Sequence, residues 1–115
     1  MARKADEALI LNPDKTVSET NTANILLVKD NTVIKPVSPH VLPGIMETVV
    51  CKLLTGWGFK IESRRLFLED LFAFDEIMIT NSLIGAIPVL SIDREKLPEP
   101  SDLWKKINKT LLVTP

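Results

Sequence analysis

The sequence predicts a mixed α/β domain, in which a mostly antiparallel β-meander is followed by alternating strands and helices. Three observations predict this fold class. Short apolar and β-branched runs, separated by turn residues, occupy the first third of the chain. One long stretch, residues 45–57, repeats its apolar residues at the helical period. Beyond it, strand-like runs alternate with two further helical patterns. With 115 residues, the chain is expected to form a single domain, 1–115.

A hairpin is the clearest feature of the first part of the chain. Two apolar runs, residues 24–29 and 32–37, flank Asp30-Asn31, two residues that tolerate the left-handed conformation of a tight turn. Pro36 lacks the N–H that a ladder needs, so the second strand should end there or lie at an edge. Two shorter strands are expected upstream, at 8–11 and 16–20, with a turn over 12–15 between them.

The best helix of the chain begins after Gly44. A broad apolar stripe runs along it, Gly56 and Gly58 supply its stop, and Cys51 falls toward its polar side. The stripe comprises Ile45, Met46, Val49, Val50, Leu53, Leu54 and Trp57.

Strands and helices alternate in the rest of the chain. Residues 59–64 have the period of a half-buried strand, and residues 66–74 are typical of a short helix. Two buried strands are expected at 77–80 and 86–92. The last helix has Ser101 as its N-cap and an apolar side made by Leu103, Trp104, Ile107 and Leu111.

Composition excludes several classes of partner. Lys and Arg number 14 against 15 Asp and Glu, so the net charge is −1 and no basic face for nucleic acid or an anionic membrane is expected. The longest apolar run, residues 83–90, cannot span a bilayer, and residues 1–7 show no signal peptide. The single cysteine, Cys51, cannot form an internal disulfide, which favours a cytoplasmic location.

Several kinds of chemistry are excluded as well. One His and one Cys cannot supply the usual ligand set of a zinc site, and no nucleotide cradle or serine-hydrolase elbow is present. His40 is interpreted as a surface or turn histidine rather than a base, and nothing marks Cys51 as an activated thiolate. From composition and spacing alone, the function of this α/β domain stays open.

Three motifs, in a fixed order along the chain, indicate a protein family. Glu19 and Asn24 lie in S-E-T-N-T-A-N (residues 18–24), and L-P-G-I (residues 42–45) opens the long helix. D-E-I, T-N-S and P-V follow at residues 75–77, 80–82 and 88–89. Together they resemble the C-terminal half of the class IV pyridoxal-phosphate enzymes, a family of branched-chain and D-amino-acid aminotransferases and aminodeoxychorismate lyase. The resemblance implies the C-terminal domain of that fold, without its N-terminal domain.

The resemblance implies four cofactor-binding residues and no metal. Glu19 takes the place of the carboxylate that keeps the pyridine nitrogen of pyridoxal 5′-phosphate protonated. The amides of Ile45 and Met46, at the start of the helix, and the hydroxyl of Ser82 would hold the phosphate. From the residues alone, Glu19 is better explained as an exposed carboxylate at a strand end, and Ser82 is equally well explained as a turn residue.

Three departures from the family pattern affect this expectation. The Schiff-base lysine of the family lies farther upstream of the glutamate than this chain reaches, and Lys4 and Lys15 are too close to Glu19 to match it. No catalytic residue is therefore assigned. Met46 stands where Thr is common, and Glu47 where Arg is common. A carboxylate in the first helical turn should compete with phosphate for the same N–H donors.

The resemblance leaves several functions open. The leading one is the cofactor-binding portion of an aminodeoxychorismate lyase-like enzyme, which forms 4-aminobenzoate for folate synthesis, because the T-N-S motif ends at Ser82. The alternatives are a branched-chain or D-amino-acid aminotransferase portion, a non-catalytic remnant acting through protein partners, or an unrelated α/β module. The implied partners are a missing N-terminal half or a second copy, and a small amino acid, oxo acid or aminodeoxychorismate. Without the lysine, non-covalent binding of the cofactor or none is expected of this chain.

Overall fold

A computed structural model describes residues 9–11, 17–20, 24–37, 44–83, 85–92 and 94–113, with side chains undescribed at 9–11, 18–20 and 113. The expectations for the turn at 12–15 and for Lys4, Lys15 and His40 lie outside this part of the chain. The strands are β1 (Leu9–Leu11), β2 (Val17–Thr20), β3 (Asn24–Lys29), β4 (Thr32–Pro36), β5 (Lys60–Arg64), β6 (Glu76–Asn81), β7 (Gly85–Pro88), β8 (Ser91–Ile92) and β9 (Glu95–Lys96). The helices are α1 (Ile45–Gly56), the 3-10 helix η1 (Leu68–Ala73) and α2 (Leu103–Val113).

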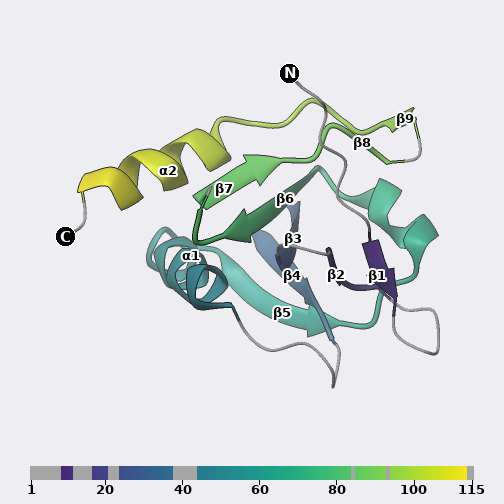
Figure 1. The fold of residues 1–115 in the computed structure, drawn as a ribbon, viewed down its shortest axis with the longest axis horizontal. Coiled ribbons are helices and arrows are strands. Elements are labelled where there is room, and N and C mark those ends of the chain that lie inside the picture. Colours follow the sequence, from purple (N-terminus) through teal and green to yellow (C-terminus); the bar gives the residue numbers. More distant parts are fainter. Residues whose placement is uncertain are drawn as a thin grey trace.

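A five-stranded sheet in the order β5-β4-β3-β6-β7 forms the centre of the molecule (Figure 1). β3 pairs antiparallel with β4 and with β6, β6 pairs antiparallel with β7, and β4 pairs parallel with β5 across the α1 crossover. The predicted hairpin is confirmed: Asp30 has a φ of 53°, the left-handed value that Asp tolerates. The strand containing Pro36 ends there, as predicted, although β5 and not β4 forms the edge.

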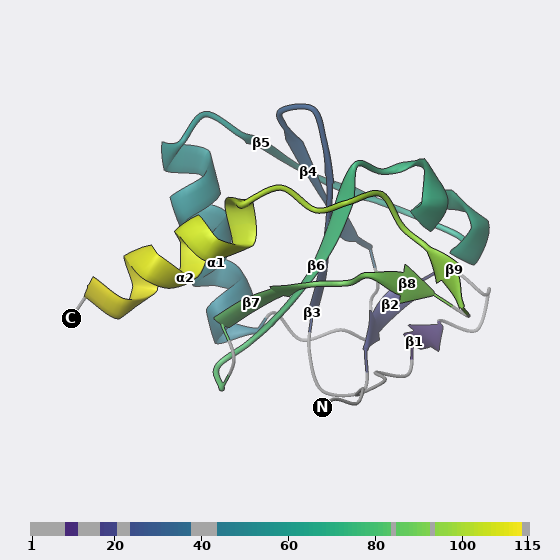
Figure 2. The same cartoon turned by 90° about the horizontal axis from the view of Figure 1, so that it is seen from above.

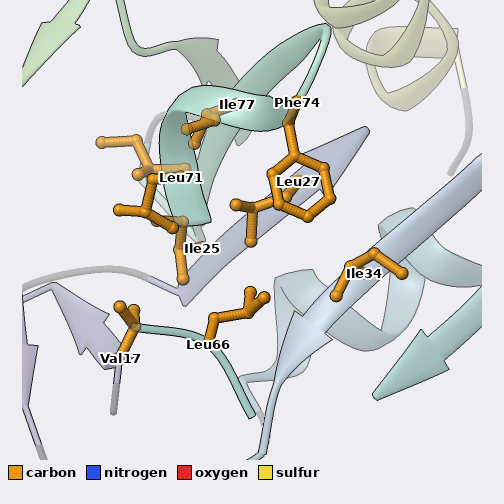
Figure 3. Packing of buried hydrophobic residues seen from close by; sticks show 9 residues of the cluster. Val17, Ile25, Leu27, Ile34, Leu66, Leu71, Phe74 and Ile77 are labelled. Atoms are coloured by element: carbon orange, nitrogen blue, oxygen red, sulfur yellow. The ribbon is translucent and has the colours of Figure 1, made fainter. Parts of the chain in front are cut away.

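The two faces of the sheet bury two separate apolar clusters. On one face β2, η1 and the segment before η1 cover β3 and β6, and Figure 3 shows how Val17, Leu66, Leu71 and Phe74 point toward one another there. On the other face α1 and α2 pack against alternate residues of the same strands, including Leu26 and Met78. Figure 2 shows both helices on one side of β3 and β6, and β1 and β2 on the other. The mixed α/β fold class is therefore confirmed.

The apolar stripe of α1 is narrower than predicted. Val50 and Leu54 are fully buried against the sheet, whereas Ile45 is 80% exposed and Val49 is 37% exposed. Ile45 begins the helix, where the chain has not yet reached the centre of the sheet. Cys51 also differs from its predicted place on the polar side, because it packs partly against the buried residues under α1. The predicted stop is confirmed, with Gly58 at a φ of 99°.

Two C-terminal predictions need correction. The helix expected over 66–74 is a 3-10 helix over Leu68–Ala73, with Asp70 Oδ2 accepting a hydrogen bond of 2.8 Å from the N–H of Phe67. The single buried strand expected over 86–92 is two strands, β7 and β8, and Leu90 between them is 62% exposed. The short pairing of β8 with β9 takes the chain out of the main sheet at that point.

Helix α2 covers the outer edge of β7. Asn108 accepts a hydrogen bond of 2.9 Å from the Ala86 N–H and donates one of 2.7 Å to the Ala86 carbonyl, so one amide satisfies both exposed backbone groups. The predicted N-cap is displaced by one residue, because the first bond within α2 runs from the Lys106 N–H to the Asp102 carbonyl. Ser101 Oγ still accepts from the Leu103 N–H at the start of the helix and donates to the buried Glu76. Neither α-helix has the length and hydropathy needed to cross a membrane.

Candidate functional site

The start of α1 meets one end of the sheet. Asn24, the first residue of β3, is buried, and a Cβ on Gly44 would overlap its Oδ1 atom, so a side chain on the residue that precedes α1 would displace the Asn24 amide. Asn24 pairs directly with Thr80 in β6. The T-N-S segment and the helix start are therefore brought together, although 36 positions separate Gly44 from Thr80. Asn24, Gly44 and the T-N-S segment, which belong to three separate motifs of the sequence, meet at this junction.

The first turn of α1 offers backbone donors at this end. The N–H groups of Ile45 and Met46 have no carbonyl partner within the helix, because the first intrahelical bond is donated by Thr48 to the Gly44 carbonyl at 3.1 Å. A helix of this length also carries about half a positive elementary charge at its start. The high exposure of Ile45 leaves this end of the helix accessible. These are the properties of an anion-binding helix terminus.

Ser82 lies in the turn directly after β6. The connection from β6 to β7 is at the same end of the sheet as the start of α1 (Figure 2). It is exposed, and the turn is held by Asn81 Oδ1, which accepts a hydrogen bond of 2.9 Å from the Leu83 N–H. The Asn81 side chain contributes a hydrogen bond to the turn, and the exposure of Ser82 leaves its side chain accessible to a ligand. The predicted phosphate residues Ile45, Met46 and Ser82 therefore lie around one end of the sheet.

Thr80 adds an observation that sequence reasoning missed. Its side chain is fully buried on the face that α1 covers, and Oγ1 has no hydrogen-bond partner among the described residues. A buried hydroxyl without a partner is costly, and such groups often await a ligand or a change of rotamer. Its polarity amid the isoleucines of β6 was the available signal. Thr80 lies beside Asn24 and two residues before Ser82, so the unpartnered hydroxyl belongs to this junction.

Glu47 and Lys35 form an ion pair under the first turn of α1. Lys35 Nζ, from β4, lies 3.6 Å from Glu47 Oε1, and the Glu47 side chain is only 8% exposed. The sequence predicts that this carboxylate competes with phosphate for N–H donors, and the structure gives it a cationic partner on the sheet side. Lys35 carried no signal in the sequence, because only the β4-α1-β5 crossover brings it beneath the helix.

Glu19 approaches the junction from the other face of the sheet. Its backbone pairs with Ile10, and its side chain lies outside the described part of the chain. β2 packs on the face of the sheet opposite α1. From the sequence, the Glu19 carboxylate and the start of α1 are expected to line one pocket. They can do so only where the two faces meet, at the end of the sheet. β2 ends at Thr20 and β3 begins at Asn24. Because these residues are four positions apart in the chain, the distance between their Cα atoms is at most about 14 Å.

Cys51 is not a nucleophile in this arrangement. Burial raises the pKa of the Cys51 thiol, and the nearby charge of Lys35 opposes that effect only in part. The thiol is therefore protonated at neutral pH, as the interpretation of an unactivated cysteine requires.

Comparison with known proteins identifies the family. A family described as "Amino-transferase class IV" matches residues 1–92, so the chain belongs to the class IV aminotransferases, enzymes that depend on pyridoxal phosphate. It is 39% identical over 90 residues to a putative branched-chain-amino-acid aminotransferase of Methanocaldococcus jannaschii, covering 76% of this chain and 31% of that protein. The chain spans between 16% and 31% of the length of curated relatives it matches.

Solved structures share the fold. The 4-amino-4-deoxychorismate lyase of Pseudomonas aeruginosa superimposes with a TM-score of 0.82 at 28% identity, over 91% of this chain and 39% of the lyase. The branched-chain amino acid aminotransferase of Escherichia coli gives a TM-score of 0.84 at 26% identity, over 92% of this chain and 37% of that chain. The expected fold, the C-terminal domain of the class IV enzymes, is confirmed.

Proposed function

We propose that this chain is the cofactor-binding portion of a class IV enzyme and that the junction at the start of α1 holds the phosphate of pyridoxal 5′-phosphate. The observation that carries the proposal is the contact of Gly44 with Asn24 beside Thr80, which sets the helix start and the Ser82 turn at one end of the sheet. Backbone donors at a helix start, an exposed hydroxyl and an unpartnered buried hydroxyl among the described residues suit a phosphate group.

Each residue of the junction has a defined task in this proposal. The Ile45 and Met46 amides donate to phosphate oxygens, and the Ser82 hydroxyl donates a further hydrogen bond. The Glu19 carboxylate keeps a proton on the ring nitrogen. When bound, the cofactor supplies an electron sink for bonds at an amino-acid α-carbon. We assign the Schiff-base lysine to a segment outside these 115 residues, and the substrate contacts to that segment or to a second copy.

For the complete enzyme we propose an aminodeoxychorismate lyase-like reaction, which eliminates pyruvate and leaves 4-aminobenzoate. The T-N-S ending at Ser82 and the likeness to the Pseudomonas aeruginosa lyase support it. A branched-chain aminotransferase is the second candidate, supported by the 39% identity to the Methanocaldococcus jannaschii protein. Assay of a lysine-bearing longer form with aminodeoxychorismate and with branched-chain amino acids distinguishes the two.

Cofactor binding by the chain itself is the first expected result. Equilibrium dialysis with pyridoxal 5′-phosphate should show saturable binding at one site, and Ser82→Ala should weaken it about tenfold or more, because one hydrogen bond to a charged group is lost. Ser91→Ala is the matched control, since Ser91 is also exposed but lies in β8, and it should leave the affinity unchanged.

Borohydride reduction tests whether this chain binds the cofactor without a covalent bond or forms a Schiff base with it. Reduction of the protein–cofactor mixture followed by mass spectrometry should leave no stoichiometric adduct. An adduct on one lysine at full occupancy would show that this chain supplies its own Schiff-base residue. Equal loss of affinity in both serine variants would place the phosphate somewhere other than the Ser82 turn.

A further inference from the structure

The contacts of the Lys35–Glu47 ion pair place it next to the proposed phosphate site. Glu47 is the third residue of α1, and its Cβ lies 3.8 Å from where a Cβ on Gly44 would stand, so its carboxylate belongs to the turn whose amides point at the ligand. Lys35 lies on the same face of β4 as Val33, which packs under α1, and its amine lies 3.6 Å from the carboxylate. The pair therefore lies directly beneath the first turn.

We propose that Lys35 is a positioning residue for the cofactor phosphate, because it neutralises Glu47 and holds that carboxylate on the sheet side of α1. The inference rests on the proposed function and concerns the same site. In this proposal, the charge of Lys35 allows the first turn of α1 to bind a dianion although that turn contains the Glu47 carboxylate. Lys35 acts through Glu47 and does not itself touch the phosphate.

The charges around the first turn show why a counter-ion is needed. The start of a helix provides about half a positive elementary charge, which one carboxylate in the first turn more than cancels. A dianion placed there would meet net negative charge. With Lys35 in the pair, the sum becomes positive again. The effect is strong because the Glu47 side chain is 8% exposed and water screens it little, while Lys35 is 32% exposed.

A double-mutant cycle on phosphate binding tests the assignment. Inorganic phosphate and pyridoxal 5′-phosphate are titrated at low ionic strength into the wild type, Lys35→Met, Glu47→Gln and the double variant. Lys35→Met should weaken binding of both ligands about tenfold, because the carboxylate then faces the anion without the lysine charge. Glu47→Gln should tighten it severalfold. In the Glu47→Gln background, Lys35→Met should change the affinity by less than about threefold.

Conservative and folding controls separate positioning from mere stability. Lys35→Arg keeps the charge and should bind within about twofold of the wild type. Unfolding in urea shows whether each variant is folded. If Lys35→Met does not fold, the tighter binding of Glu47→Gln still has to appear.

The outcomes distinguish this inference from the proposed function. Equal weakening by Lys35→Met in both backgrounds would show that Lys35 contacts the phosphate itself. Unchanged affinity in every variant would show that the ion pair has no influence on phosphate binding. Either result overturns the inference but leaves the proposed phosphate site intact. If neither the wild type nor Glu47→Gln binds either ligand, the proposed function fails together with it.

Discussion

Replacing Leu54 by Ala should lower the free energy of unfolding by about 3 kcal/mol, the largest effect expected of a single side chain on α1. Leu54 is fully buried and packs with Val50, Leu26 and Met78 between the helix and the sheet. Shortening it leaves a cavity that the surrounding strands cannot close, because they are held in register on both sides. Urea unfolding followed by circular dichroism measures the loss.

Leu112→Ala is the matched control for this prediction. Leu112 is 86% exposed on α2, so the same shortening should change the free energy of unfolding by less than about 0.5 kcal/mol. Equal effects of the two substitutions would mean that α1 does not pack on the sheet as described. The position of the phosphate site depends on that packing, because α1 carries its backbone donors.

Replacing Gly85 by Ala should destabilise the protein by about 3 kcal/mol, the sum of two costs. Gly85 has a φ of 72°, a left-handed conformation that costs an L-residue roughly 1–2 kcal/mol. Its new Cβ would also overlap Asn108 Oδ1, the atom that accepts the Ala86 N–H, so the hydrogen bonds that cover the edge of β7 would be disturbed. Thermal unfolding and urea titration both measure this change.

Two further variants show whether both causes act. Gly56→Ala meets no atom within 4 Å at the end of α1, so it should be neutral or stabilise the protein by up to about 1 kcal/mol. Combining Gly85→Ala with Asn108→Ala removes the overlap, so the double variant should lose less stability than the sum of the single losses. Strict additivity would show that backbone strain at Gly85 is the only cost.

The long helix shows what local pattern can and cannot predict. The spacing of apolar residues predicts its extent, and its observed bounds are Ile45–Gly56, because propensity and the glycines act locally. The exposure of Ile45 and Val49 could not be predicted in the same way. It depends on where the helix crosses the sheet, which the β4-α1-β5 connection decides.

The site was predicted by resemblance more than by physics. Ile45, Met46 and Ser82 were expected because their motifs resemble a family, and the structure brings their elements to one end of the sheet. Thr80 and Lys35 were missed as site residues. The polarity of Thr80 among the isoleucines of β6 is a weak signal, and a lysine before a proline has no distinct local pattern. Their importance arises from pairing with Asn24 and with Glu47, residues far from them in the sequence.

Mapping the bound anion onto the backbone tests the phosphate site most directly. In a ¹⁵N-labelled sample of the whole chain, titration with pyridoxal 5′-phosphate should shift the amide resonances of Ile45, Met46 and Ser82 most, in one saturable phase, and inorganic phosphate should move the same signals. If the perturbed amides gather instead around the β8–β9 pair, or if none moves at millimolar ligand, the start of α1 does not bind the cofactor phosphate.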